Sequence, residues 1–348
     1  MRHESRPGAR GGGAAAVLCG AGYWLPPLIV TNADLCARLD TSEEWITSRT
    51  GISTRRRVTA DITTADLAAE AAERALKSAG GGEVHALILG TTTPDRRCPA
   101  TAPEVASRLG LGCIPAFDVS AVCTGFLYAL ATGAGFLAAG LAERVMVVAA
   151  ESFSTLLDPD DRSTAPIFGD GAGAVVLRQG SPDERGAVGD IILGSDGTRS
   201  ELIRVGAAGP RGPLENRPGP GTAQYFQMAG REVFRHAVER MSAAAAAAAE
   251  SAGWRLDEVD RFYAHQANAR ITSAVANELG IPAERLAENI QEVGNTAGAS
   301  IPILLAQTAA SGFLAADHRV LITAFGGGLT WGATTLTWPE VEIVAEQR

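Results

Sequence analysis

The sequence lacks the features that would place a chain in a membrane, in an oxidising compartment or on a nucleic acid. No uninterrupted apolar run in its 348 residues reaches the ~18 that a membrane-spanning helix needs. The cysteines are odd in number and include no CxxC pair, which argues against a disulfide framework or a zinc site and favours a reducing, cytoplasmic location. They are Cys19, Cys36, Cys98, Cys113 and Cys123. Basic residues are outnumbered, giving a net charge of −9, so a nucleic-acid partner is not expected.

The composition is typical of a folded globular protein, with 46% hydrophobic and 20% charged residues. The first 13 residues are rich in arginine and glycine but have no apolar core, so we expect a disordered tail there rather than a signal peptide. A second short tail is expected over residues 339–348. The basic run Arg55-Arg56-Arg57 is interpreted as solvated surface, with contact to an anionic ligand as the alternative.

Short apolar strand patterns alternate with helical patterns along the rest of the chain. The strand patterns cover residues 86–91, 145–150, 174–177, 190–193, 261–265, 320–324 and 334–338. The helical patterns cover residues 64–79, 103–109, 125–139, 230–252, 269–279 and 301–311. This alternation predicts an α/β protein with two stacked halves, over residues 14–179 and 189–338. The Gly/Pro-rich stretch at 206–221 is expected to be an irregular loop between sheet elements. Each half ends in a glycine-rich turn and an apolar strand, which fits an internally duplicated fold.

Cys123 stands where an extended apolar stretch is followed by a helical pattern. A helix N-terminus offers unpaired N–H groups and a partial positive charge, which favour the thiolate. Such placement can lower a cysteine pKa from ~8.5 to roughly 3.5–7.5. We therefore predict a nucleophile, although this stretch alone leaves open a small buried hydrophobic residue.

Two further polar residues complement this thiol. His265 ends an apolar strand, at the edge where α/β proteins place their ligands, and Asn295 lies in a small-residue loop before an apolar helix. Singly, they are better explained as a structural histidine and a turn or N-cap residue. Together with Cys123 they suit thioester chemistry, because a thiolate can become acylated while His265 and Asn295 polarise a second thioester carbonyl. This polarisation would stabilise the enolate that remains after loss of CO₂.

Seven stretches in order along the chain resemble the β-ketoacyl-[acyl-carrier-protein] synthase III family of the thiolase superfamily. They read TSEEWITSRTGI (41–52), DVSAVCTG (118–125), FGDGAG (168–173), MAGREVF (228–234), HQAN (265–268), GNT (294–296) and AFGGGLTWG (324–332). The resemblance covers about Val17 to Trp338. It implies a thiolase fold, in which two duplicated α/β halves stack in five layers (αβαβα), and a homodimer.

The resemblance also implies a reaction and the residues that perform it. An acyl-CoA primer would acylate Cys123, and a decarboxylative condensation with malonyl-acyl carrier protein would give 3-oxoacyl-carrier protein in fatty-acid or polyketide initiation. His265 and Asn295 would form the decarboxylation pair. Gly327 would supply the second oxyanion N–H beside that of Cys123. Acyl-CoA would be a substrate, with no permanently bound cofactor and no metal.

Four further positions match substrate-binding residues of the family. Trp45 and Arg162 match the pair that holds the adenine of coenzyme A between an indole and a guanidinium, which is physically sensible because both planes stack on an aromatic base. Arg49 matches a residue near the nucleotide phosphates. Phe234 matches the residue that flanks the catalytic tunnel.

The chain departs from the family pattern in two places. Arg235 and Arg270 match basic positions where an acidic acyl carrier protein docks, but the basic pair common on the following helix is replaced by Asn277-Glu278, so this patch is thinner or the partner differs. Relatives commonly place a bulky apolar residue from the dimer partner at about Cys98, where it closes the acyl pocket. The smaller cysteine predicts a longer or wider pocket and a primer larger than acetyl.

Two other functions compete with condensation. A synthase III-like acyltransferase would move an acyl group from CoA or a carrier protein to a hydroxyl, an amine or a carrier thiol in antibiotic biosynthesis, without decarboxylation. Asn295 favours condensation, because simple acyl transfer has less need of a second donor to a carbonyl. A non-catalytic acyl-CoA-binding protein is disfavoured by the joint presence of Cys123, His265 and Asn295.

Overall fold

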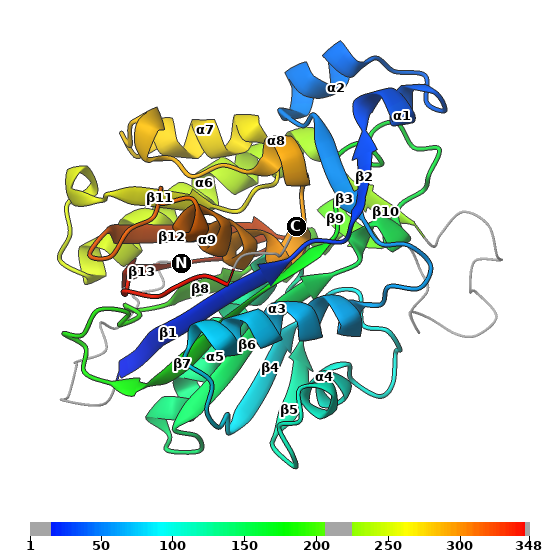
Figure 1. Ribbon diagram of the computed structural model, residues 1–348. Helices are drawn as coiled ribbons and strands as arrows, with labels where there is room; N and C mark the ends of the chain where they lie inside the picture. The colour runs from blue at the N-terminus through cyan, green and yellow to red at the C-terminus, as the bar shows by residue number, and fades with distance from the viewer. Residues whose placement is uncertain (1–14, 206–224, 345–348) are drawn as a thin grey trace.

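Two mixed β-sheets with helices on both sides of each form the protein (Figure 1). The computed structural model describes residues 15–205 and 225–344. The expected N-terminal tail, the loop at 206–221 and the last part of the expected C-terminal tail lie outside the described residues. None of the helices in the described part of the chain is both long and apolar enough to cross a membrane.

The first sheet combines parallel and antiparallel strands. In spatial order it contains β1 (Ala15–Trp24), β7 (Gly171–Gly180), β6 (Arg144–Glu151), β4 (Ala86–Gly90) and β5 (Ala116–Val119). β4, β5 and β6 are mutually parallel, whereas β7 is antiparallel to both β6 and β1. Every residue of β4 is buried, as expected for a parallel strand covered on both faces.

The second sheet has four strands, and two short hairpin-like pairs stand beside the main sheets. The four strands are β11 (Arg261–Ala264), β12 (Arg319–Gly326), β13 (Thr330–Thr337) and β8 (Ile192–Ser195). The short pairs are β2 (Leu28–Thr31) with β3 (Thr54–Arg57), and β9 (Ile203–Val205) with β10 (Phe226–Met228). β11 is parallel to β12, and the other pairings of the second sheet are antiparallel.

The helices form three layers around the two sheets. α3 (Thr64–Ser78) and α4 (Ala102–Arg108) cover the outer face of the first sheet, and α6 (Gly230–Ser251) and α7 (Ala269–Glu278) cover that of the second. α5 (Gly125–Ala138) and α9 (Ser300–Ala310) lie between the sheets. This αβαβα arrangement confirms the predicted fold.

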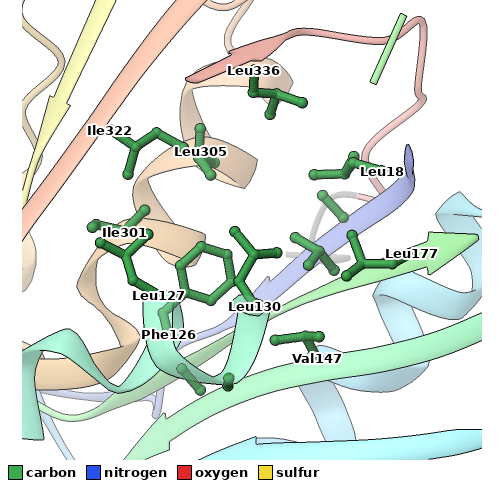
Figure 2. Packing of buried hydrophobic residues seen from close by; sticks show 14 of the residues in the cluster. Leu18, Phe126, Leu127, Leu130, Val147, Leu177, Ile301, Leu305, Ile322 and Leu336 are labelled. Carbon is green, nitrogen blue, oxygen red and sulfur yellow. The ribbon is translucent and has the colours of Figure 1, made fainter. Parts of the chain in front are cut away.

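The central layer holds the main core. α5 and α9 carry no charged residues, as expected of helices that are covered on all sides. Figure 2 shows Phe126, Leu127 and Leu130 of α5 packed with Ile301 and Leu305 of α9. Residues from both sheets close this cluster, namely Leu18, Val147, Leu177, Ile322 and Leu336. The two sheets are therefore fixed on a common core, and so are the loops at their edges.

The predicted strands and helices are all present, with ends displaced by a few residues. β1 was not predicted, because alanine and glycine replace the β-branched residues that mark a strand. These small residues are needed for packing: a Cβ on Gly22 would lie 2.4 Å from the backbone nitrogen of Ala75 on α3.

The arginine run at 55–57 is not solvated surface, so that expectation was wrong. Arg55 lies on β3 and is fully buried, and its guanidinium donates to Asn32 Oδ1 at 2.7 Å and to the Pro166 carbonyl at 2.9 Å. Arg57 donates to the carbonyl of Ala165 at 2.7 Å. The run therefore supports the loop that contains residues 161–168.

Two short helices near the N-terminus and a third beside β3 complete the fold. The first two are α1 (Asn32–Cys36) and α2 (Glu43–Thr50), and the short α8 (Ile290–Val293) lies near β3. α2 begins at Ser42, whose hydroxyl accepts from the Trp45 N–H at 3.1 Å, and ends at Gly51 in the left-handed conformation with φ of 80°. A Cβ at Gly51 would lie 2.5 Å from the Cβ of Ala269, so α2 packs closely against the start of α7.

Candidate active site

Cys123 lies in a strained turn at the carboxyl end of β5. The turn η1 (Val122–Thr124) leads directly into α5. Val122 adopts a φ of 48°, a left-handed conformation that is rare for a β-branched residue. The Thr124 hydroxyl lies 2.7 Å from the Ala121 carbonyl and 2.8 Å from the Thr330 hydroxyl, which ties the turn to the second sheet.

His265 follows β11 and is held by its backbone. Its N–H donates to the Thr323 carbonyl at 2.9 Å, and its own carbonyl accepts from the Ala267 N–H at 2.9 Å. The side chain is buried, yet neither ring nitrogen has a hydrogen-bond partner. Burial lowers the pKa of His265 to about 3, so the imidazole is neutral near pH 7. A buried imidazole with both nitrogens free can bond to a substrate.

Asn295 is fixed between the two halves of the chain. Its N–H donates to the Ile167 carbonyl at 2.9 Å, and its carbonyl accepts from the Gly169 N–H at 3.0 Å. The glycine-rich stretch after Phe168 therefore pairs with the Asn295 loop. The side-chain Oδ1 accepts from the Ala297 N–H at 2.9 Å, and the NH₂ group has no partner among the described residues.

The three predicted catalytic residues line one small apolar cavity of about 40 Å³. Its walls include Phe168, Ile203, Phe226, Met228 and Phe325, together with Cys123, His265 and Asn295. Phe168, Phe226 and Phe153 form an aromatic cluster with ring centroids 4.4 to 5.2 Å apart, and Cys123 packs against it. The structure thus brings together a thiol, a neutral imidazole and a carboxamide.

The glycine turn after β12 lies directly on Cys123. A Cβ on Gly326 would be 2.9 Å from both the Cβ and the backbone nitrogen of Cys123, so only glycine allows this approach. Gly326, rather than the predicted oxyanion residue Gly327, lines the cavity. Gly327 is the next residue of the same turn, and its carbonyl accepts from the Thr330 hydroxyl at 3.0 Å.

The predicted lowering of the Cys123 pKa is wrong for the free protein. Burial and the negative charge of Glu151 raise the pKa of the Cys123 thiol to about 12, outweighing a backbone hydrogen bond that acts in the opposite direction. The placement at a helix N-terminus is confirmed, but η1 intervenes and the thiol is surrounded by apolar residues and one acid. The sequence motif showed neither effect.

A larger pocket of about 580 Å³ opens beside this cavity. Met228, Val233, Ala267, Ile271 and Asn295 line both. The pocket therefore leads from the surface to the residues around Cys123. Its size is typical of a site for a small molecule or cofactor. The predicted residues Trp45, Arg49, Arg162, Phe234 and Arg270 all line it.

Trp45 and Arg162 are in contact with each other. The Arg162 guanidinium carbon lies 5.7 Å from the centroid of the Trp45 ring, and the guanidinium donates to the Asp40 carbonyl at 2.9 Å. An aromatic base stacks at about 3.5 Å from each neighbouring plane, so one could enter between the two side chains only if they moved apart. The predicted pair is thus present, but its two side chains lie too close together to hold an adenine between them.

Four arginines surround the mouth of this pocket. Arg49, Arg231 and Arg270 line it, and Arg235 lies one turn after Arg231 on the exposed side of α6. None of the four forms an ion pair within the described ranges. A cation in the first turn of a helix opposes the helix dipole, so Arg231 does not serve the stability of α6. It was not predicted, because sequence alone does not show which face of α6 borders the pocket.

Cys98 is exposed and lines neither cavity of the chain that carries it. Its expected contact with an acyl group therefore requires a second copy of the chain. No group of three or more His, Cys, Asp or Glu side chains that could hold a metal is found within the described residues.

Comparisons with known proteins agree with this geometry. Family models described as 3-oxoacyl-[acyl-carrier-protein] synthase III and its C-terminal part match residues 117–197 and 249–338. The chain is 58% identical over 332 residues to β-ketoacyl-[acyl-carrier-protein] synthase III 3 of Streptomyces coelicolor, covering 95% of this chain and 99% of the relative. The crystal structure of 3-oxoacyl-(acyl carrier protein) synthase III from Pseudomonas aeruginosa PAO1 has a TM-score of 0.88 at 46% identity, covering 94% of this chain and 99% of that one. The priming β-ketosynthase of the R1128 polyketide pathway has a TM-score of 0.87 at 32% identity, covering 96% and 99%.

Two stacked sheets around a buried helix layer, with a cysteine, a histidine and an asparagine at their shared edge, define a thiolase-like α/β protein. Within this class the chain belongs to the β-ketoacyl-[acyl-carrier-protein] synthase III family. It is an acyltransferase that performs the condensation by which fatty-acid or polyketide synthesis begins.

Proposed function

We propose that the small cavity at Cys123 carries out both chemical steps of this condensation. One observation carries the proposal: Cys123, His265 and Asn295 line a single apolar cavity, in which the buried imidazole has no protein partner for either nitrogen. Buried polar groups normally find partners, so those in this cavity are available to a substrate.

In the first step the Cys123 thiolate attacks the carbonyl carbon of an acyl-CoA. A bond forms between this carbon and the cysteine sulfur, and the bond to the CoA sulfur breaks. The CoA thiolate leaves and takes up the proton that Cys123 gave up. The N–H groups of Cys123 and Gly327 bind the oxyanion of the tetrahedral intermediate, and the close approach of Gly326 to Cys123 supports this role.

In the second step a malonyl group on a carrier protein replaces CoA in the cavity. The neutral His265 and the NH₂ group of Asn295 donate hydrogen bonds to the malonyl thioester carbonyl. The bond to the carboxylate breaks, CO₂ leaves, and its electron pair forms an enolate. The enolate carbon then attacks the acyl-cysteine, and the thiolate of Cys123 departs from the new 3-oxoacyl product.

The outer pocket is proposed to hold the nucleotide part of the acyl-CoA. Trp45 and Arg162 would separate to admit the adenine, and Arg49 would face the phosphates from the same wall. The unpaired charge of Arg49 supports an anionic ligand, because the chain as a whole is acidic. Phe234, exposed on the rim, would flank the path to Cys123.

An acidic acyl carrier protein is the proposed partner at the same mouth. Arg235 and Arg270 were expected there, and Arg231 adds a third unpaired charge on α6. α7 offers Asn277-Glu278 where the family commonly has a basic pair, so these three arginines carry the proposed docking. Positive charge around a mouth attracts an acidic partner and orients it for delivery.

A homodimer is proposed because the acyl pocket needs a residue that one chain does not supply. β5 is an edge strand of the first sheet, and Cys98 is exposed without reaching its own cavity. A second copy paired along this edge could place its Cys98 loop near Cys123. The unpaired cysteines support a reducing cytoplasm as the proposed location.

Acylation of Cys123 tests the proposed function. Incubation with acyl-CoA should raise the intact mass of the wild-type protein by one acyl group, located by peptide mapping on Cys123. Cys123→Ala should show no such addition, whereas Cys113→Ala, which changes another cysteine outside both pockets, should be acylated like the wild type. Full turnover by Cys123→Ala would remove this residue from the mechanism.

A further inference from the structure

Glu151 is a fully buried acid at the carboxyl end of β6. The Thr92 N–H donates to its two oxygens, each at 3.1 Å, and the Thr93 hydroxyl donates at 3.0 Å. Within the ranges 15–205 and 225–344 it forms no ion pair. A carboxyl group in such a place is costly to ionise, because only neutral donors surround it.

The carboxyl group lies behind two turns of the catalytic cavity. A Cβ on Gly298 would come 3.1 Å from Glu151 Oε1 and 2.9 Å from the Val122 carbonyl oxygen, so all three groups meet in one small space. Val122 precedes Cys123. Gly298 belongs to the turn η7 (Ala297–Ala299), whose first N–H holds Asn295. Glu151 itself lines neither pocket, so it acts on the cavity through these turns and through its charge.

Its effect on the nucleophile is electrostatic. The negative charge of Glu151 adds to burial in raising the pKa of the Cys123 thiol, and burial raises the pKa of Glu151 itself to about 8. Two acids this close, in apolar surroundings, do not both ionise near neutral pH. Their proton losses are then properties of the pair rather than of either residue.

The other ionisable groups around Cys123 do not compensate this charge. His265, facing the cavity from β11, is neutral. Tyr128 of α5 donates its hydroxyl to the Gly194 carbonyl at 3.0 Å. Asp170, just before β7, accepts from Val58 and Ser154 instead. The turn η7 and the glycine turn after β12 contain no ionisable side chain.

We propose that Glu151 is a positioning residue for Cys123: it supports the η1 and η7 turns and shares one negative charge with the thiol, and so sets the pH at which the thiolate forms. The inference rests on the proposed role of Cys123 as the nucleophile. When Glu151 carries the charge, Cys123 stays a thiol. When Glu151 carries the proton, the thiolate forms more readily.

Glu151→Gln tests the shared charge. Its amide oxygen can accept the same hydrogen bonds from Thr92 and Thr93, but it cannot carry a charge. The rate of alkylation of Cys123 by iodoacetamide, followed against pH by peptide mass mapping, should move to lower pH by about one unit, which is about a tenfold higher thiolate fraction at a given pH. Glu151→Asp, which keeps the charge, should stay closer to the wild-type profile.

A buried carboxyl group just before the neighbouring strand β7 provides the control. Asp170→Asn should leave the Cys123 alkylation profile in place, because Asp170 does not act on the thiol. A Glu151→Gln profile that coincides with the wild type, or that moves to higher pH, would overturn the proposal.

A second measurement keeps the test decisive if Glu151→Gln does not fold. Infrared spectra of Asp170→Asn, which lacks the other buried carboxyl group with a raised pKa, should then show a protonated buried carboxyl group at pH 6 to 7, and its absence would overturn the shared charge. Acylation of the wild type by acyl-CoA, measured in parallel, separates the proposed function from the proposed role of Glu151. Without acylation the proposed function fails, whereas the alkylation profiles still decide the role of Glu151.

Discussion

At the scale of single residues, the central feature is a buried histidine that lines the catalytic cavity without hydrogen-bond partners. His265 is neutral, and both its nitrogens are free. A neutral imidazole can donate a hydrogen bond to a thioester carbonyl without bringing a charge into the apolar cavity. We therefore propose that His265 acts in the enolate-forming step, whereas the acyl-cysteine forms by thiolate attack.

His265→Ala should therefore separate the two steps. We expect condensation to fall by about 10²–10³-fold, the cost of removing one donor to a developing oxyanion. Acylation of Cys123, followed by intact mass in a stopped time course, should fall much less. Equal losses in both steps would contradict the division of roles.

His236 offers a matched control for this substitution. It is also a buried histidine with both ring nitrogens unpartnered, but it lies on α6 and lines neither pocket at the active site. His236→Ala should lower stability through the cavity it leaves, while both catalytic steps stay close to the wild-type rates.

Sequence motifs predicted Cys123, His265 and Asn295 as a catalytic set, and the structure brings these three residues to one cavity. The motifs were not sufficient to predict the ionisation of Cys123. Glu151 follows an unbroken apolar run in β6, and only the fold brings its charge to the thiol. Arg55 was misjudged for the same reason, since its partners lie on distant segments.

At the scale of elements, α6 joins the reactive cavity to the surface. Val233, Ala237 and Met241 of this helix line the cavity at Cys123, whereas Arg231 and Phe234 border the outer pocket. The sequence predicted that this segment is helical, but it did not show which of its side chains border the cavity and which border the outer pocket. One helix thus contacts both the acyl-binding cavity and the proposed docking surface.

Arg231→Glu tests the docking surface. Reversing this charge should raise the KM for malonyl-carrier protein by about tenfold and leave kcat nearly unchanged, because the residue contacts a partner rather than the reacting atoms. The effect should shrink at high salt. Steady-state kinetics at two ionic strengths would measure both.

Arg255→Glu makes the same change in net charge just beyond the other end of α6. Arg255 is exposed and pairs with Asp257, far along the helix from the pocket mouth. An equal rise in KM for this variant would mean that total charge, and not the position of Arg231, governs binding of the carrier.

At the scale of the whole molecule, the two sheets were predictable from the sequence, whereas the homodimer expected from the resemblance stays a prediction. Alternating patterns and glycine-rich turns indicated two similar halves, and both sheets pack on the shared core of α5 and α9. In the single chain β5 is an edge strand and Cys98 is exposed, and the proposed dimer would cover both.

Cys98→Phe tests the proposed dimer and the acyl pocket together. If the loop of the partner closes this pocket, the larger side chain should narrow it, and the ratio of kcat/KM for isobutyryl-CoA to that for acetyl-CoA should fall about tenfold or more, a loss comparable to rejecting an extra methyl group or two. Cys113→Phe, another exposed cysteine, should leave the ratio unchanged.

Light scattering of the wild type checks the same claim without a substitution. A dimer at assay concentration is expected. A monomeric, fully active protein would contradict a contribution from a second chain, and strict preference of the wild type for acetyl-CoA would contradict the larger primer expected from Cys98.

The most direct measurement of the central claim is release of labelled CO₂ from carboxyl-labelled malonyl-carrier protein. With acyl-CoA present, the wild type should release one CO₂ for each 3-oxoacyl-carrier protein formed. Cys123→Ala should form no 3-oxoacyl-carrier protein, whether or not it releases CO₂. Transfer of the acyl group to an acceptor with no CO₂ released would contradict condensation at Cys123, His265 and Asn295.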